Sequence, residues 1–118
     1  MPRYSAKLMD HFQAPRNHGR LDAPDRVGVS GTPGVGHFTK LEMRLKDGII
    51  MQCRFQTHGC GTAIACGSAL TELVIGRAIP DALAVTPEQL MMSLDGVPDD
   101  KRHCVKAAIA ALHDAFKD

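Results

Sequence analysis

The chain has 118 residues, with 14 Lys and Arg against 13 Asp and Glu, so its formal net charge is +1, and 44% of its residues are hydrophobic. This composition is typical of one globular domain over residues 1–118 and excludes a disordered tail. Near-neutral charge and the absence of tryptophan argue against nucleic-acid binding. No apolar run has the length of a membrane span, and the first residues lack a signal peptide's apolar stretch. We therefore expect a soluble, cytoplasmic protein.

The first third of the chain predicts one short helix and a long irregular connection. Ser5 is expected to cap the helix, which carries apolar residues at helical spacing and ends at Pro15. Residues 13–38 are rich in Pro and Gly, which predicts turns and a short strand at residues 27–29. His37 lies in this segment, and we expect it on a flexible loop.

A β-hairpin is the strongest local signal. Polar and apolar residues alternate over residues 40–46, which is typical of a half-buried strand. Asp47 and Gly48 favour the tight turn that joins two antiparallel strands. On the return strand, the same alternation predicts a buried face made of Ile49, Met51, Cys53 and Phe55.

The second half of the chain predicts helices. Thr62 is expected to cap a helix that runs to Gly76, and Pro80 and Pro87 begin two shorter helical pieces. Residues 99–100 are expected to open a long C-terminal helix. Its apolar line is Val105, Ile109, Leu112 and Phe116. Three strands followed by helices predict an α+β fold, with a small three-stranded antiparallel sheet packed against the helices.

The four cysteines differ in their expected surroundings. Cys53 and Cys66 lie on predicted buried faces, where a free cysteine acts as a small hydrophobe. Cys60 stands between two glycines at a strand-to-helix junction. The flanking glycines contribute little to packing, so this position indicates a function. The N-terminus of the following helix also favours its thiolate. Cys104 is expected about 100° from the apolar line of the last helix, flanking the core contact.

Three separate segments therefore carry candidate metal ligands. They are the loop with His37, the junction with Cys60, and the adjacent pair His103 and Cys104. Thiolate and imidazole suit zinc, iron and copper better than they suit magnesium or calcium. The separation of the cysteines is not that of a zinc finger, so spacing alone does not specify the metal.

Three sequence segments resemble a known family. Residues 4–19, which include Asp10-His11-Phe12 and Pro15-Arg16-Asn17, are similar to the family's opening Y…DH(Y/F)xxPRNxG. Residues 56–65 resemble its YGCGxAIA segment, and residues 101–104 resemble its K-x-HC segment. Their order and separation match over nearly the whole chain. On these motifs the chain resembles the IscU/NifU-type scaffold proteins of iron–sulfur cluster assembly.

This resemblance implies a binding protein, not an enzyme. Scaffolds of the family accept sulfur from a cysteine desulfurase, assemble a [2Fe–2S] cluster with iron and an electron source, and pass it to apo-protein acceptors. Three cysteines usually ligate the cluster, with an aspartate and a histidine close by. By position, Cys60 matches the second cysteine, Cys104 the third and His103 the histidine. Val35 stands at the first cysteine and His37 at the aspartate, which excludes a three-cysteine site at the usual positions.

The predicted site is therefore His37, Cys60, His103 and Cys104, with two thiolates and two imidazoles. This set suits a [2Fe–2S] cluster or iron, and it also suits tetrahedral Zn²⁺. A homodimer in which each chain gives two cysteines would supply four thiolates to one cluster. Cys66 becomes a third sulfur only if the start of its helix unwinds.

Three alternatives stay open. The first is a zinc-bound sulfur acceptor that assists a cysteine desulfurase, and the second is a degenerate member that binds only a protein partner. The third is an enzyme with Cys104 as nucleophile. It is disfavoured because neighbouring residues on a helix point about 100° apart, which is expected to keep His103 away from the Cys104 sulfur.

Overall fold

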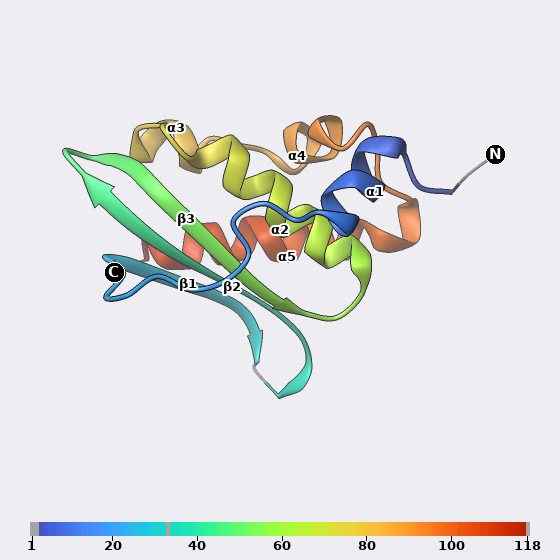
Figure 1. The fold of residues 1–118 in the computed structure, drawn as a ribbon, viewed down its shortest axis with the longest axis horizontal. Coiled ribbons are helices and arrows are strands. Elements are labelled where there is room, and N and C mark those ends of the chain that lie inside the picture. Colours follow the sequence, from blue (N-terminus) through green and yellow to red (C-terminus); the bar gives the residue numbers. More distant parts are fainter. Residues whose placement is uncertain (1–2, 33, 118) are drawn as a thin grey trace.

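The order of elements along the chain is one helix, three strands and then helices to the end (Figure 1). The computed structural model describes residues 3–32 and 34–117. The elements are α1 (Ala6–Gln13), β1 (Arg26–Thr32), β2 (Val35–Lys46), β3 (Ile49–His58), α2 (Gly61–Val74), α3 (Ile79–Leu83), α4 (Pro87–Ser93), a 3₁₀ helix (Asp99–Lys101) and α5 (Arg102–Ala115). The α+β prediction is confirmed.

The three strands form an antiparallel sheet in the order β1-β2-β3, as predicted. Asp47 and Gly48 connect β2 to β3, and both have positive φ, at 54° and 77°. Strand β2 begins earlier than expected, so His37 lies on a strand and not on a flexible loop. It gains this position because residues 30–32 of β1 extend the pairing toward the start of β2.

A β-bulge corrects the predicted buried face of β3. Arg44 pairs with Gln52 but Leu45 pairs with Ile50, so Met51 is an extra residue on β3. An extra residue reverses the alternation of side chains beyond it. Ile50 is consequently buried, whereas the expected core residues Ile49 and Met51 are exposed. Cys53 and Phe55 lie on the other side of the bulge and are buried as predicted.

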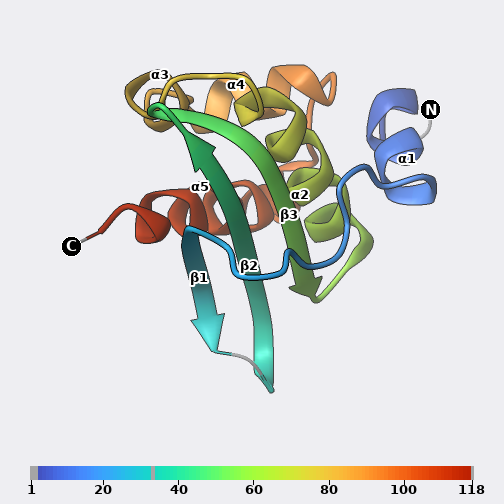
Figure 2. The ribbon, with the colours of Figure 1, turned by 60° about the vertical axis from the view of Figure 1, so that its left-hand side comes forward.

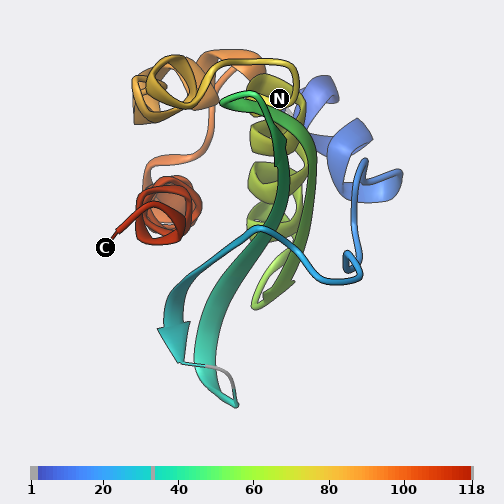
Figure 3. The same cartoon turned by 90° about the vertical axis from the view of Figure 1, so that its left-hand side faces the viewer.

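Helices α2 and α5 cover one face of the sheet (Figures 2 and 3). Close packing of α5 on β1 depends on Gly28, because a Cβ there would come within 2.0 Å of the Ala111 carbonyl oxygen. The side chain of Asp114 also accepts a hydrogen bond from the backbone N–H of Val29 at 2.8 Å. On α2, Gly67 leaves room for the ring of Phe55 in the same way. These contacts fix both helices on the sheet.

Helix α1 packs on α2 through a buried polar contact. His11 Nδ1 lies 2.8 Å from Ser68 Oγ, which also accepts a hydrogen bond from the backbone N–H of Arg16. The chain then continues along the outer edge of β3, where Asn17 and Gly19 exchange backbone hydrogen bonds with Phe55. This connection holds the N-terminal segment against both α2 and the sheet.

Several predicted helix ends are confirmed, and two are corrected. Ser5 caps α1, and Thr86 forms a capping box with Gln89 at the start of α4. Cys60, not Thr62, occupies the N-cap of α2, so Thr62 lies inside the helix and is buried. A 3₁₀ turn takes up residues 99–101, so α5 starts later than expected.

The buried stripe of α5 is rotated toward Cys104. Cys104 is only 4% exposed, which corrects the expectation that it would flank the core contact. The stripe turns because α5 contacts both the sheet and α2, and small alanines allow close approach on that side. The buried residues of α5 are Cys104, Val105, Ala108, Ala111, Leu112 and Ala115. Over the described residues, no helix combines the length and the apolar character needed to cross a membrane.

Candidate functional site

The three ligand-bearing segments meet at one end of the sheet. His37 lies near the start of β2, Cys60 at the junction of β3 and α2, and His103 with Cys104 in the first turn of α5. The junction of β3 with α2 curves past the start of α5 in Figure 1. Sequence-distant residues therefore come together at the N-termini of two helices.

The Cys60 and Cys104 sulfurs are 3.6 Å apart. All four cysteines are free thiols. Cys60 is half-buried and Cys104 is buried, so the pair has one sulfur at the surface and one beneath it. The predicted site requires these two thiols to meet, and the contact shows that they do.

Both predicted histidines lie beside the sulfur pair. His103 Nε2 is 3.5 Å from the Cys104 sulfur, which shows that the expectation of too great a separation was wrong. The reason is that the imidazole side chain is long enough to bring a ring nitrogen to the neighbouring sulfur although the two Cα–Cβ bonds diverge. The His37 and His103 ring centroids are 5.6 Å apart at 82°. His37 also lies over Gly59, the residue before Cys60.

The electrostatics of the two thiols differ. Burial opposes ionisation of Cys60, but the backbone N–H groups of Ala63 and Thr62, the Cys104 thiol and the charge of Lys101 together lower its pKa. Burial, reinforced by Cys60, raises the pKa of Cys104 to about 12. Cys60 is therefore the first of the two to ionise, and its thiolate accepts a hydrogen bond from Cys104.

The other two cysteines are core residues, as predicted. Cys53 is 1% exposed and Cys66 is fully buried. Burial raises the pKa of Cys53 to about 12 and also raises the pKa of Cys66. Neither thiol lines a cavity beside the sulfur pair, so both are closed to an incoming ion or donor.

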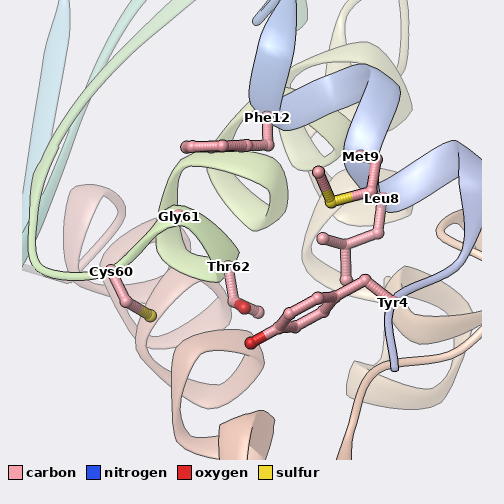
Figure 4. Close-up of a pocket in the computed structure, with 7 residues that line it drawn as sticks. All are labelled: Tyr4, Leu8, Met9, Phe12, Cys60, Gly61 and Thr62. Atoms are coloured by element: carbon pink, nitrogen blue, oxygen red, sulfur yellow. The ribbon is translucent and has the colours of Figure 1, made fainter. Parts of the chain in front are cut away.

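Two cavities adjoin the sulfur pair on different sides. An apolar cavity of about 250 Å³ lies between α1 and the start of α2 (Figure 4). It is lined by Tyr4, Leu8, Met9, Phe12, Cys60, Gly61 and Thr62. A second cavity, of about 30 Å³, is lined by residues that include His37, His103 and Cys104. Each cavity is lined by one of the two cysteines.

Among residues 3–32 and 34–117, no group of three or more His, Cys, Asp and Glu side chains is placed to hold a metal ion as it stands. The four candidates form close pairs and not a single coordination sphere. His37 and His103 are exposed, so rotation of their side chains is the change that would bring their nitrogens together with the sulfurs. The side chain of Val35 lies outside the described part of the structure.

Two contributions to the site were missed in the sequence. Lys101 acts on Cys60 through its charge, and Tyr4 and Phe12 line the apolar cavity beside it. Lys101 and Phe12 fall within the segments that resembled the family, which was the available signal. Their proximity to Cys60 depends on the packing of α1 and of α5 against α2, which local patterns do not show.

Residues 3–118 match the family model described as the NifU-like N-terminal domain. This chain belongs to that family. The iron–sulfur cluster assembly scaffold protein IscU 1 of Archaeoglobus fulgidus is 41% identical over 115 residues, which are 98% of this chain and 75% of that protein. The corresponding IscU of Escherichia coli is 40% identical, with 91% of each chain covered.

Solved structures support the assignment of the NifU-like fold. The N-terminal part of a NifU-like protein from Brucella abortus superimposes with a TM-score of 0.78 at 16% identity, over 97% of this chain and 92% of that one. A putative scaffold protein from Fervidobacterium islandicum gives 0.76 at 20% identity, over 97% and 96%. At these identities the likeness establishes the fold alone.

Proposed function

We propose that this NifU-like domain is a scaffold or carrier in iron–sulfur cluster assembly, and that it holds iron or a [2Fe–2S] cluster through Cys60 and Cys104. The observation that carries the proposal is the 3.6 Å contact between these two sulfurs, with two imidazoles beside them. The scaffold names of relatives at about 40% identity support it.

The site suits an anionic cargo. Cys60 caps α2, and Cys104 lies in the first turn of α5, so the positive ends of two helix dipoles face the sulfurs. Lys101 adds a positive charge near Cys60. Thiolates and sulfide-bridged iron carry negative charge, so this environment stabilises the loaded state.

His103 and His37 are the proposed additional ligands. By family position, Val35 removes a thiolate and His37 puts a neutral imidazole in place of a carboxylate, so the ligand shell is less negative, and His-ligated [2Fe–2S] centres have raised potentials. The cluster is therefore expected to be more easily reduced than one held by thiolates. It is also expected to be acid-sensitive, because protons compete with the metal for the ligand atoms.

The proposed partners follow from the cargo. A cysteine desulfurase supplies sulfur, iron and electron donors complete the cluster, and apo-proteins receive it. Two thiols per chain also favour a homodimer that shares one cluster, because the pair of chains then gives the four thiolates that such a cluster takes.

Anaerobic reconstitution with ferrous iron and sulfide tests the proposal. We expect visible charge-transfer absorption and bound iron and sulfide in the wild type, and loss of both in Cys60→Ala and Cys104→Ala. Cys53→Ala is the matched control because it removes a buried thiol from the core. Native mass spectrometry gives the number of chains per cluster.

A wild-type protein that binds neither iron nor sulfide under these conditions would overturn the scaffold proposal. Zinc is the competing occupant, because two thiolates and two imidazoles match its tetrahedral preference. Three results together would favour the zinc-bound sulfur acceptor over the cluster scaffold. The purified protein would contain equimolar zinc, Cys104→Ala would lose that zinc, and the wild type would form no cluster after the zinc is removed.

A further inference from the structure

We propose that Cys60 and Cys104 act as a dithiol that reduces a persulfide to sulfide. In this step a persulfide formed on Cys60 is attacked by Cys104, which leaves a Cys60–Cys104 disulfide and releases hydrogen sulfide. The inference rests on the proposed function for the origin of the sulfur, which is a protein persulfide of the kind a desulfurase presents.

The two sulfurs differ in access. Cys60 is half-buried and lines the 250 Å³ cavity, whereas Cys104 is 4% exposed and does not line it. A donor that approaches through this cavity reaches Cys60 first. Figure 4 shows the Cys60 sulfur directed toward the side where Thr62 and the Tyr4 hydroxyl lie. Cys60 is therefore the residue that accepts the outer sulfur.

Proximity makes Cys104 the residue that resolves the persulfide. The 3.6 Å separation of the sulfurs is close to the approach distance of about 3–3.5 Å from which reacting atoms proceed. A disulfide bond is about 2.05 Å long, so side-chain rotation has to bring the atoms roughly 1.5 Å closer. The other two cysteines, Cys53 and Cys66, are both buried in the core.

The step balances as a thiol–disulfide exchange. The Cys104 sulfur forms a bond to the Cys60 sulfur, and the bond between Cys60 and the outer sulfur breaks. The electron pair of that bond leaves with the outer sulfur as hydrosulfide, which takes the Cys104 proton. Cys104 is oxidised and the outer sulfur is reduced. A reducing dithiol, such as a redoxin-type protein, returns the disulfide to two thiols.

The leaving sulfur also needs space beside Cys60. In such a displacement the attacking, central and leaving sulfurs lie close to a line. The leaving sulfur thus departs from the side of Cys60 that faces away from Cys104. Cys60, but not Cys104, lines the 250 Å³ cavity, which provides room beside Cys60 for the hydrosulfide.

The test uses the full chain, reduced and free of metal, mixed anaerobically with one equivalent of a low-molecular-weight alkyl persulfide. We expect about one sulfide released per chain. We also expect both Cys60 and Cys104 to be lost to alkylation and to be restored by a dithiol. In Cys104→Ala we expect a stable persulfide on Cys60 and sulfide release slower by about tenfold or more. Cys53→Ala should match the wild type.

Three results would overturn the inference. They are a stable persulfide in the wild type, equally fast sulfide release from Cys104→Ala, and sulfide release with no Cys60–Cys104 disulfide in the peptide map. The last is measured on the wild type, so it does not depend on the variant folding. If iron and inorganic sulfide give a cluster while the persulfide is not reduced, this inference fails and the scaffold stands. If no metal binds while persulfide is reduced, the scaffold proposal fails alone.

Discussion

The imidazole of His37 occupies the space that a side chain on Gly59 would take: a Cβ built on Gly59 lies 2.3 Å from His37 Nδ1. The glycine before Cys60 therefore lets the start of β2 approach the junction of β3 and α2. Because His37 is exposed, its ring can move away at low cost when this space is filled.

Gly59→Ala is expected to displace His37 from the site and also to lower Tm, because the φ of 153° at Gly59 is one that residues with a Cβ rarely adopt. If His37 is a ligand, affinity for iron or zinc should fall by about tenfold or more, as is usual when the support of a ligand is lost. Metal titration of Gly59→Ala, His37→Ala and the double variant measures this. Equal losses in the three variants are expected, and additive losses would show that Gly59 does not act through His37.

Gly67→Ala is expected to lower the free energy of unfolding by about 1–3 kcal/mol, because its Cβ would lie 2.4 Å from the buried ring of Phe55. Gly61→Ala is the matched control on the same helix. Its Cβ meets Phe12, which is 40% exposed and free to turn away. Urea unfolding compares the two, and an equal loss of stability in both would contradict the packing difference.

The stability of the apo-protein is expected to fall below about pH 6.5 through His11. Burial lowers the pKa of His11, and the Arg16 cation lowers it further against the opposing charges of Glu72 and Asp10. The unfolded chain therefore binds the proton more readily than the folded one. The free energy of unfolding must then decrease as the pH falls from about 6.5 toward the pKa of the folded state.

His11→Asn is the variant that isolates this effect, because an amide can replace the hydrogen bond to Ser68 without titrating. Urea unfolding at several pH values should give a flatter profile for His11→Asn than for the wild type. His113→Asn, which removes an exposed histidine from α5, controls for the loss of an imidazole. A wild-type slope that persists in His11→Asn would exclude His11 as its source.

Val35→Cys is expected to increase cluster retention. By family position Val35 takes the place of a cysteine, and a third thiolate would strengthen a site that now has two. A chelator should remove the cluster more slowly from Val35→Cys than from the wild type, as measured by the decay of visible absorption. Val27→Cys, which places a thiol on β1, is the control. If Val35→Cys and Val27→Cys retain the cluster equally well, position 35 is not a ligand site.

The elements of this fold could be predicted where local chemistry decides. Asp47 and Gly48 adopt positive φ because a tight hairpin requires it, and Ser5 caps α1 because its hydroxyl accepts a free backbone N–H. The bulge at Met51 could not be predicted, because an extra residue on one strand leaves the alternation in the sequence intact. Its position is decided by which residues pair across the sheet.

The site was predicted in part for the same reason. The glycines around Cys60 indicated a function, but its contact with Cys104 followed only from the family resemblance. The helical pattern of apolar residues did not predict the burial of Cys104, because the rotation of α5 depends on its contacts with both β1 and α2. The reach of His103 depends on side-chain torsions that residue spacing does not encode.

The hydrogen bond from Val29 to Asp114 blocks sheet growth. Strand β1 is an outer strand, and its free N–H groups would otherwise be a template on which another chain can add a strand. The helix that closes this edge carries His103 and Cys104 at its other end, about 15 Å away. The protection against strand-to-strand association and the placement of the Cys104 thiol therefore depend on the same helix. A variant in which α5 detaches from β1 is expected both to lose the bound metal or cluster and to aggregate.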